Sequence, residues 1–145
     1  MEFMELLRNH LLVNALAAWA VAQVLKTVIH AVIHGSVDIW RLMGDGGMPS
    51  GHSATVTAMA TTAAMEYGLG SPWFAVTTVL AVIVMHDAMG VRLEASKHAK
   101  ALNDLFEMFS SDLKTDEKLK EFLGHTPIQV CAGAVLGLVV ALILG

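Results

Sequence analysis

The chain has 145 residues and a mass of 15.5 kDa, which suits a single domain over residues 1–145. Only 15% of the residues are charged and 55% are hydrophobic, with a mean hydropathy of +0.61, whereas soluble domains carry about 25% charged residues, so the composition favours a membrane protein. The net charge of −4 argues against a nucleic-acid-binding module, and the single cysteine excludes an internal disulfide scaffold.

Four stretches of the chain lack Asp, Glu, Lys and Arg. They are 17, 20, 20 and 24 residues long, and a helix needs about 20 residues to cross the hydrocarbon core of a bilayer. We therefore expect an all-α integral membrane bundle of about four transmembrane helices, with one amphipathic helix at the membrane interface. The uncharged stretches cover residues 9–25, 46–65, 67–86 and 122–145.

The first helix is expected from about Glu5 to Ile33, with Gly35 at its end. Its N-terminal side carries Glu2 and Glu5 in place of a cationic run, so we interpret it as a membrane helix and not as a cleaved signal peptide. Lys26 lies near its end among apolar residues. Such a charge is either functional or belongs to a side chain that extends to the interface.

The second helix is expected from near Pro49–Ser50 to around Gly68–Gly70. Its many Ser and Thr residues suit a helix packed inside the bundle. A glycine-rich segment leads into its N-terminus, which favours a bound anion, and His52 can transfer protons near neutral pH. The alternative is a plain helix start with an interfacial histidine. The segment is Gly46-Gly47-Met48-Pro49-Ser50-Gly51-His52-Ser53-Ala54.

The third helix is expected from Pro72 to about Met89, with proline in its first turn. Asp87 and Arg92 place a carboxylate and a guanidinium near its end. Apolar residues then recur on one face of residues 92–109, which predicts the amphipathic helix.

The fourth helix is expected over residues 126–144. His125 directly precedes it, and Gln129 follows one turn later, where its side chain can bond the histidine ring. This arrangement resembles an oriented nucleophile or base, and the alternative is an interfacial histidine before a helix that starts with proline. Gly133 and Gly137 form a stripe of small residues for helix packing.

Four crossings place residues 35–50 and 92–120 on one side of the membrane, and the termini on the other. The segment 92–120 is rich in Lys, so the positive-inside rule puts this side in the cytoplasm, and we expect the plasma membrane of a prokaryote. Four helices can enclose an active site only in part, so the protein could also form a homodimer.

The candidate residues on the cytoplasmic side form the set that phosphoryl transfer requires. Cations and backbone amides surround the equatorial oxygens, one histidine attacks, and another protonates the leaving oxygen. The cations are Lys26, Arg92 and Arg41, the amides belong to residues 50–52, and the histidines are His52 and His125.

Three segments occur in an order typical of one family. They are Pro49-Ser50-Gly51-His52, then the run from Asp87 to Arg92, and then the run from His125 to Gly133. Together they resemble the divergent branch of the type-2 phosphatidic acid phosphatase superfamily, which includes bacterial acid phosphatases and vanadium-dependent haloperoxidases. The resemblance covers roughly residues 26–137.

This resemblance implies a metal-independent phosphatase without a cofactor that acts on a phosphorylated lipid in the bilayer. His125 would attack phosphorus to give a phosphohistidine, and His52 would protonate the leaving alkoxide. Gln129 and Asp87 complete the catalytic candidates. The phosphoryl oxygens would be held by Lys26, Ser50, Gly51, Arg92 and, as a further candidate, Arg41.

Two positions depart from the superfamily's usual third motif. Gln129 replaces an orienting Asp, and it can fix a histidine tautomer but cannot stabilise an imidazolium by charge. Leu119 stands where an Arg is usual, so Arg92 can take that role only if residues 92–120 are an insertion within the motif.

Two other functions stay open. The same anion pocket could bind or carry a phosphorylated lipid without hydrolysing it, which the absence of the usual Asp favours. Alternatively, a transition metal could be held by His30, His34 and Asp38, which are spaced four residues apart although Gly35 interrupts the run. His86 and Asp87 at the end of another helix belong to the same alternative.

Overall fold

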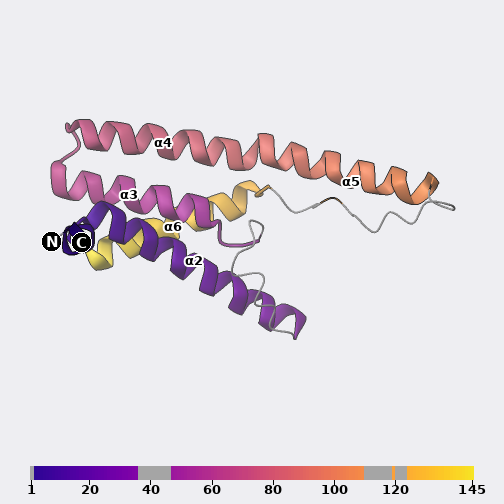
Figure 1. Cartoon of the computed structure of the whole chain (residues 1–145), viewed down its shortest axis with the longest axis horizontal. Coiled ribbons are helices and arrows are strands. Elements are labelled where there is room, and N and C mark those ends of the chain that lie inside the picture. The colour runs from indigo at the N-terminus through magenta and orange to yellow at the C-terminus, as the bar shows by residue number, and fades with distance from the viewer. Residues whose placement is uncertain (1, 36–46, 110–118, 120–123) are drawn as a thin grey trace.

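The computed structural model describes residues 2–35, 47–109, 119 and 124–145. These residues form six α-helices, and no strand occurs among them (Figure 1). The expected bounds of the later helices are confirmed within three residues. The helices are α1 (Glu2–Leu7), α2 (His10–His34), α3 (Gly51–Tyr67), α4 (Pro72–Met89), α5 (Val91–Phe109) and α6 (Pro127–Leu144).

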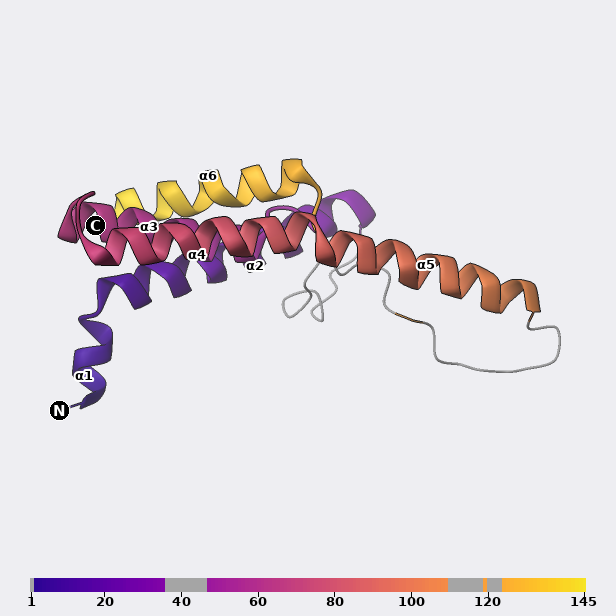
Figure 2. The ribbon, with the colours of Figure 1, turned by 90° about the horizontal axis from the view of Figure 1, so that it is seen from above.

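The first expected helix is divided in two, so its predicted start at Glu5 is wrong. The chain leaves α1 at Arg8, and Asn9 caps α2 by accepting a hydrogen bond from the backbone N–H of Leu12 at 3.1 Å. Asparagine is among the best N-cap residues, so it starts a new helix here. Figure 2 shows α1 bent away from the bundle. The predicted end at Gly35 is confirmed, with a left-handed φ of 67°.

Helix α3 lies at the centre of the bundle. It contacts α2, α4 and α6, which surround it in Figures 1 and 2. Some of its hydroxyl groups bond within the protein: Thr55 donates to the carbonyl of Gly51 at 2.8 Å, and Ser53 donates to Oγ of Ser50 at 3.0 Å. The prediction that this Ser/Thr-rich helix packs inside is confirmed.

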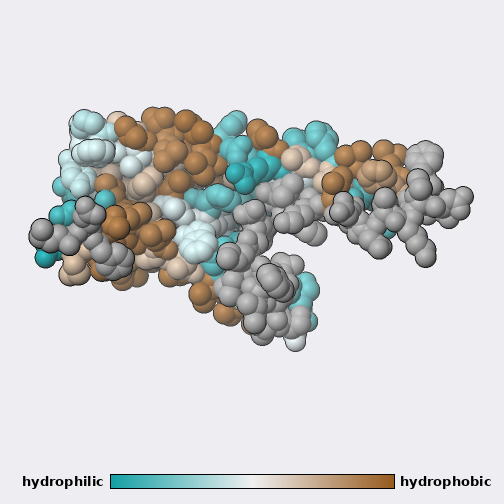
Figure 3. Space-filling model, viewed as in Figure 1, coloured by the Kyte–Doolittle hydropathy of each residue, from teal (hydrophilic) through white to brown (hydrophobic). Residues whose placement is uncertain are grey.

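The packing has small and polar residues inside and large apolar residues outside. Among the described residues, the largest fully buried side chains are those of His125, Thr62, Ser50 and Ser53, and the apolar core consists mostly of alanine. Figure 3 shows apolar residues over the outer face of α4, where Val76 is 63% exposed. This distribution suits lipid on the outside, since close packing of small residues joins helices in a membrane.

Within the part of the chain that the structure describes, three helical segments are long and apolar enough to cross a membrane, one fewer than expected. Helix α3 does not qualify because it has 17 residues and a more polar composition. Its neighbours cover it, so its surface does not need to be apolar. The qualifying segments are His10–His34, Pro72–Met108 and Pro127–Leu144.

The amphipathic segment is helical as predicted, but it does not lie across the bundle as an interfacial helix. Helix α5 continues α4 along nearly the same direction (Figure 1). Backbone hydrogen bonds run through the junction, because Gly90 donates to His86 at 2.8 Å and Glu94 donates to Gly90 at 3.0 Å. The apolar pattern predicts which face of a helix is covered, but not its direction relative to the preceding helix.

The glycine stripe of α6 packs directly on α3, as predicted. A Cβ atom on Gly133 would lie 2.3 Å from the carbonyl oxygen of Ser50, and one on Gly137 would lie 2.2 Å from that of Ala54. Only glycine permits this approach of backbone to backbone. The contact brings the N-terminal ends of α3 and α6 side by side, with the histidine motifs at their starts.

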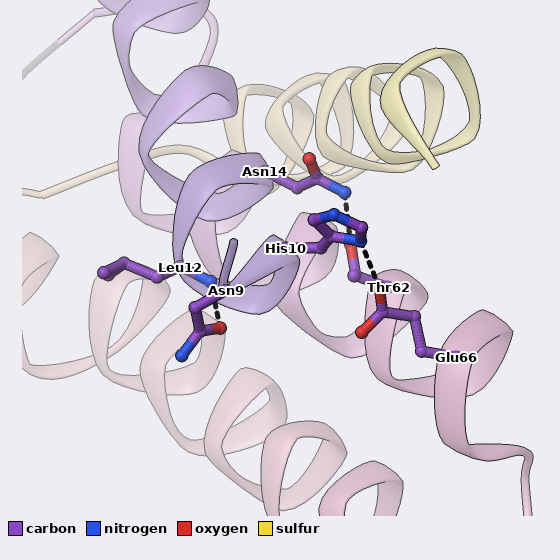
Figure 4. A network of polar contacts seen from close by, with 6 residues as sticks. All are labelled: Asn9, His10, Leu12, Asn14, Thr62 and Glu66. Atoms are coloured by element: carbon purple, nitrogen blue, oxygen red, sulfur yellow. Dashed lines mark hydrogen bonds and ion pairs between the residues drawn. The ribbon is translucent and has the colours of Figure 1, made fainter. Parts of the chain in front are cut away.

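Polar contacts join α2 and α3 at the opposite end of the bundle (Figure 4). The buried amide of Asn14 donates to the hydroxyl of Thr62 at 3.0 Å, and His10 contacts Glu66 nearby. These contacts hold α2 against α3 far from the histidine motifs.

Candidate active site

The two motif histidines lie next to one another. His52 is in the first turn of α3, and His125 directly precedes the cap of α6 and is fully buried. Their ring centroids are 5.9 Å apart in an edge-on arrangement. The backbone N–H of His125 donates to the carbonyl of Ala88 at 3.0 Å, so α4 also fixes its position.

Gln129 holds His125 and caps α6 with the same side-chain oxygen. Its Oε1 accepts the backbone N–H of Thr126 at 3.0 Å and lies 3.4 Å from Nδ1 of His125. The bond from Thr126 identifies this atom as the oxygen, which can only accept. The contact with Nδ1 therefore requires the proton on Nδ1 and leaves the lone pair on Nε2. Thr126 and Gln129 form a capping box, which gives Gln129 a structural role as well.

Ser50 is the N-cap of α3 and is fully buried. Its Oγ accepts hydrogen bonds from the backbone N–H of Ser53 at 3.3 Å and from the Ser53 hydroxyl at 3.0 Å. The backbone N–H of Ser50 donates to the carbonyl of Gln129 at 3.1 Å. Ser50 thus starts α3 and ties it to α6, while its own hydroxyl proton can still be donated.

A cavity of about 330 Å³ adjoins His52. The Lys26 side chain lines it and is only 4% exposed, so it does not extend to the surface. Gly47, with a φ of 98°, packs on Lys26, because a Cβ there would lie 3.2 Å from Cγ of the lysine. His125 does not line this cavity. Other lining residues are Trp19 and Gln23 from α2, and Gly51, His52 and Thr55 from α3.

Asp87 and Arg92 pair with each other, with Nε and Oδ2 at 2.7 Å, and do not line the cavity. Each side chain is 43% exposed. The backbone of Arg92 nevertheless lies close to the third motif, because a Cβ on Gly124 would come within 2.7 Å of its carbonyl carbon. Figure 3 shows hydrophilic residues gathered where α4 passes into α5. Arg41 lies outside the described residues.

The metal alternative depends on a residue that the structure does not describe. His30 and His34 stack with ring centroids 4.2 Å apart, and Asp38 lies outside the described residues. Within the described ranges, no three His, Cys, Asp or Glu residues form a group that could hold a metal ion.

Trp19 and Gln23 are site residues that the sequence reasoning missed. They precede Lys26 by seven and three residues, so all three lie on one face of α2. A polar Gln in an uncharged stretch, at helical spacing from a buried Lys, is the signal that could have identified them.

Known proteins are similar to this chain over nearly its full length. The chain is 42% identical to a protein of Bacillus subtilis (strain 168), called "Uncharacterized membrane protein YuiD", over 153 aligned residues that cover 97% of each chain. No solved structure matches the chain. The sequence profile described as "Divergent PAP2 family" matches residues 7–140, and the chain therefore belongs to the divergent PAP2 family.

Proposed function

We propose that this protein is a metal-independent membrane phosphatase that hydrolyses a phosphorylated lipid through a phosphohistidine. The observation that carries the proposal is the pair of His125 and His52, with ring centroids 5.9 Å apart and Gln129 at Nδ1 of His125. Two histidines this close supply a nucleophile and an acid for one phosphoryl group. Family membership supports the same chemistry.

The reaction proceeds in two steps. Nε2 of His125 attacks phosphorus while the bond from phosphorus to the lipid oxygen breaks, and His52 gives its proton to that oxygen. Water then attacks the phosphohistidine, with His52 as the base, and releases inorganic phosphate. Since the two rings are in contact, the phosphoryl group has to part them as it binds.

The negative charge of the phosphoryl group is balanced from α2 and α3. Lys26 supplies a buried cation on the cavity wall, and the first turn of α3 supplies backbone N–H groups and the positive end of the helix dipole. The Ser50 hydroxyl can donate from the same turn. Arg92 could also bind the phosphoryl oxygens if its ion pair with Asp87 breaks and the guanidinium turns to the phosphate. Arg41 remains a further candidate.

The fourth membrane crossing in this proposal is α3. The chain ends, the turn between α3 and α4, and the network of Asn14 and Thr62 then lie on one side of the bilayer. The histidine motifs and α5 lie on the other side, and the Lys-rich connector supports a cytoplasmic location for that side in the plasma membrane of a prokaryote. A homodimer is compatible with this arrangement.

Phosphate release from a set of lipid phosphates tests the proposal. Purified protein in detergent micelles is given phosphatidate, lysophosphatidate, phosphatidylglycerophosphate and a polyprenyl pyrophosphate, without added metal and with a chelator. We expect at least one of them to release inorganic phosphate. Absence of release from all four would contradict an enzymatic function.

A non-catalytic lipid-phosphate binder is the second candidate, and one observation favours it. The cavity is lined by Lys26 and His52, whereas His125 is fully buried and does not line it. If the protein is only a binder, lipid phosphates should bind to it and no inorganic phosphate should be released. The same set of lipids therefore separates the two functions.

Gln129 is expected to affect the chemical step more than substrate affinity. The Gln129→Leu variant removes the acceptor at Nδ1 of His125 and half of the capping box, so we expect kcat to fall by about 10- to 100-fold with little change in KM. The Gln129→Glu variant keeps both acceptor functions and should retain more activity. Equal kcat values for the Leu variant and the wild type would show that Gln129 does not orient the nucleophile.

A further inference from the structure

The cavity beside His52 changes character along α2. Lys26, Gln23 and Trp19 line it from this helix. With a rise of about 1.5 Å per residue, Gln23 lies about 4.5 Å along the axis from Lys26, and Trp19 about 6 Å further. A charged group is thus followed by a neutral polar group and then by an aromatic ring. Val84 of α4 adds an apolar wall.

The side chain of Gln23 carries a buried acceptor that the protein leaves unused. Gln23 is 7% exposed, and its Oε1 has no hydrogen-bond partner among the described residues. This oxygen lies 3.9 Å from the position that a Cβ on Gly51 would take, on the cavity wall. An unsatisfied buried acceptor destabilises the folded protein, and such groups are rare in native structures.

The neighbouring hydroxyl groups of Thr55 and Thr27 donate to backbone carbonyls and not to the Gln23 side chain. Thr55 donates to the carbonyl of Gly51 at 2.8 Å, and Thr27 donates to the backbone carbonyl of Gln23 at 2.9 Å, not to its amide. A hydrogen-bond donor to Oε1 of Gln23 therefore has to come from a ligand bound in the cavity. A volume of about 330 Å³ suits the polar part of a lipid near its phosphate, whereas long acyl chains have to extend into the bilayer.

We propose that Gln23 is a specificity-determining residue that accepts a hydrogen bond from a free hydroxyl close to the phosphate of the substrate. The proposal rests on the proposed function, because the phosphate is placed at the end of the cavity formed by Lys26 and His52. Gln23 and Lys26 lie one turn apart on the same face of α2, so a substrate that places its phosphate at Lys26 can present a hydroxyl on the next carbon to Gln23. The preferred class is thus lipid phosphates with a free hydroxyl at that carbon.

Other lipid phosphates lack this donor. Phosphatidate carries an ester at that carbon, and a polyprenyl phosphate carries hydrocarbon only. Either substrate leaves Oε1 of Gln23 buried and unsatisfied in the complex, which weakens binding.

The test compares two lipids that differ in one hydroxyl. Equilibrium dissociation constants are measured in detergent micelles for oleoyl lysophosphatidate and for its analogue without the hydroxyl, oleoyl propanediol phosphate. We expect the wild type to bind lysophosphatidate about tenfold more tightly, which corresponds to one buried hydrogen bond. The Gln23→Met variant, similar in volume but without an acceptor, should bind both lipids equally. The Val84→Ala variant changes the same cavity without removing a polar group and should keep the preference.

Equal binding of the two lipids by the wild type overturns the proposal, whether or not Gln23→Met folds. A preference that persists in a folded Gln23→Met protein also overturns it. Phosphate release from both lipids is recorded in parallel. A hydroxyl preference without release means that the phosphatase function fails while the role of Gln23 holds, and release without a preference means the reverse. Failure of both lipids to bind overturns the role of Gln23, while the phosphatase function is then decided by release from the other lipid phosphates.

Discussion

The His125→Ala variant is expected to lose phosphate release by about 10⁴-fold or more, because no other group on α6 replaces the attacking nitrogen. Removal of a nucleophile leaves only binding and charge stabilisation, as enzymes with covalent intermediates show. Initial rates of phosphate release from the best-hydrolysed lipid phosphate measure this loss. His125 is fully buried, so a second variant, His125→Asn, keeps a polar side chain in the space.

The control for this experiment is His98→Ala. His98 lies on α5, is exposed, and belongs to no part of the proposed site, so activity should stay within about twofold of the wild type. A folded His125→Asn protein with activity close to that of His98→Ala would exclude His125 as the nucleophile.

The Gly133→Ala variant is expected to lose both stability and activity. The added Cβ would lie 2.3 Å from the backbone oxygen of Ser50, so α6 has to move away from α3. Overpacking of this kind costs about 1–3 kcal/mol. Because the same contact places His125 beside His52, the displacement should also reduce kcat by at least tenfold. Thermal unfolding in detergent and the rate of phosphate release check the two effects.

Gly70→Ala is the matched control. Gly70 lies in the turn between α3 and α4 and has nothing within 4 Å of the position that a Cβ would take. Its replacement should change the free energy of unfolding by less than about 0.5 kcal/mol. Equal unfolding temperatures for the two variants would mean that α6 does not pack on α3 through Gly133.

Local signals in the sequence were sufficient for most helix bounds. Pro72 after Ser71 starts α4, and Gly35 ends α2 with its left-handed backbone. The spacing of Gly133 and Gly137 also predicted close packing, although it did not show that α3 is the partner. These features depend on backbone preferences of single residues, which a sequence displays directly.

Features that depend on how helices lie relative to one another were not predictable in the same way. The continuation of α4 into α5 depends on hydrogen bonds across Gly90, and the break before α2 depends on capping by Asn9. The spacing of apolar residues predicts neither the hydrogen bonds across Gly90 nor the cap at Asn9. The contact between Gln129 and His125 was anticipated from their spacing, because the Gln129 side chain that turns back to cap α6 at Thr126 also reaches the residue before the cap.

The cavity likewise contains residues that the sequence predicts and one that it does not. Lys26 and His52 were candidates from the sequence, since a buried charge and a motif histidine stand out individually. Gln23 did not, because an amide in a membrane helix has no distinctive meaning until a cavity is known beside it.

Trapping of the covalent intermediate tests the central claim most directly. Purified protein is mixed with a lipid phosphate radiolabelled on phosphorus, quenched in alkali, and digested for peptide mapping. The account predicts label that is stable to alkali, labile to acid, and confined to the peptide that contains His125, with none in the His125→Asn variant. Label on any other residue, or steady phosphate release without a labelled protein in a rapid quench, would contradict it.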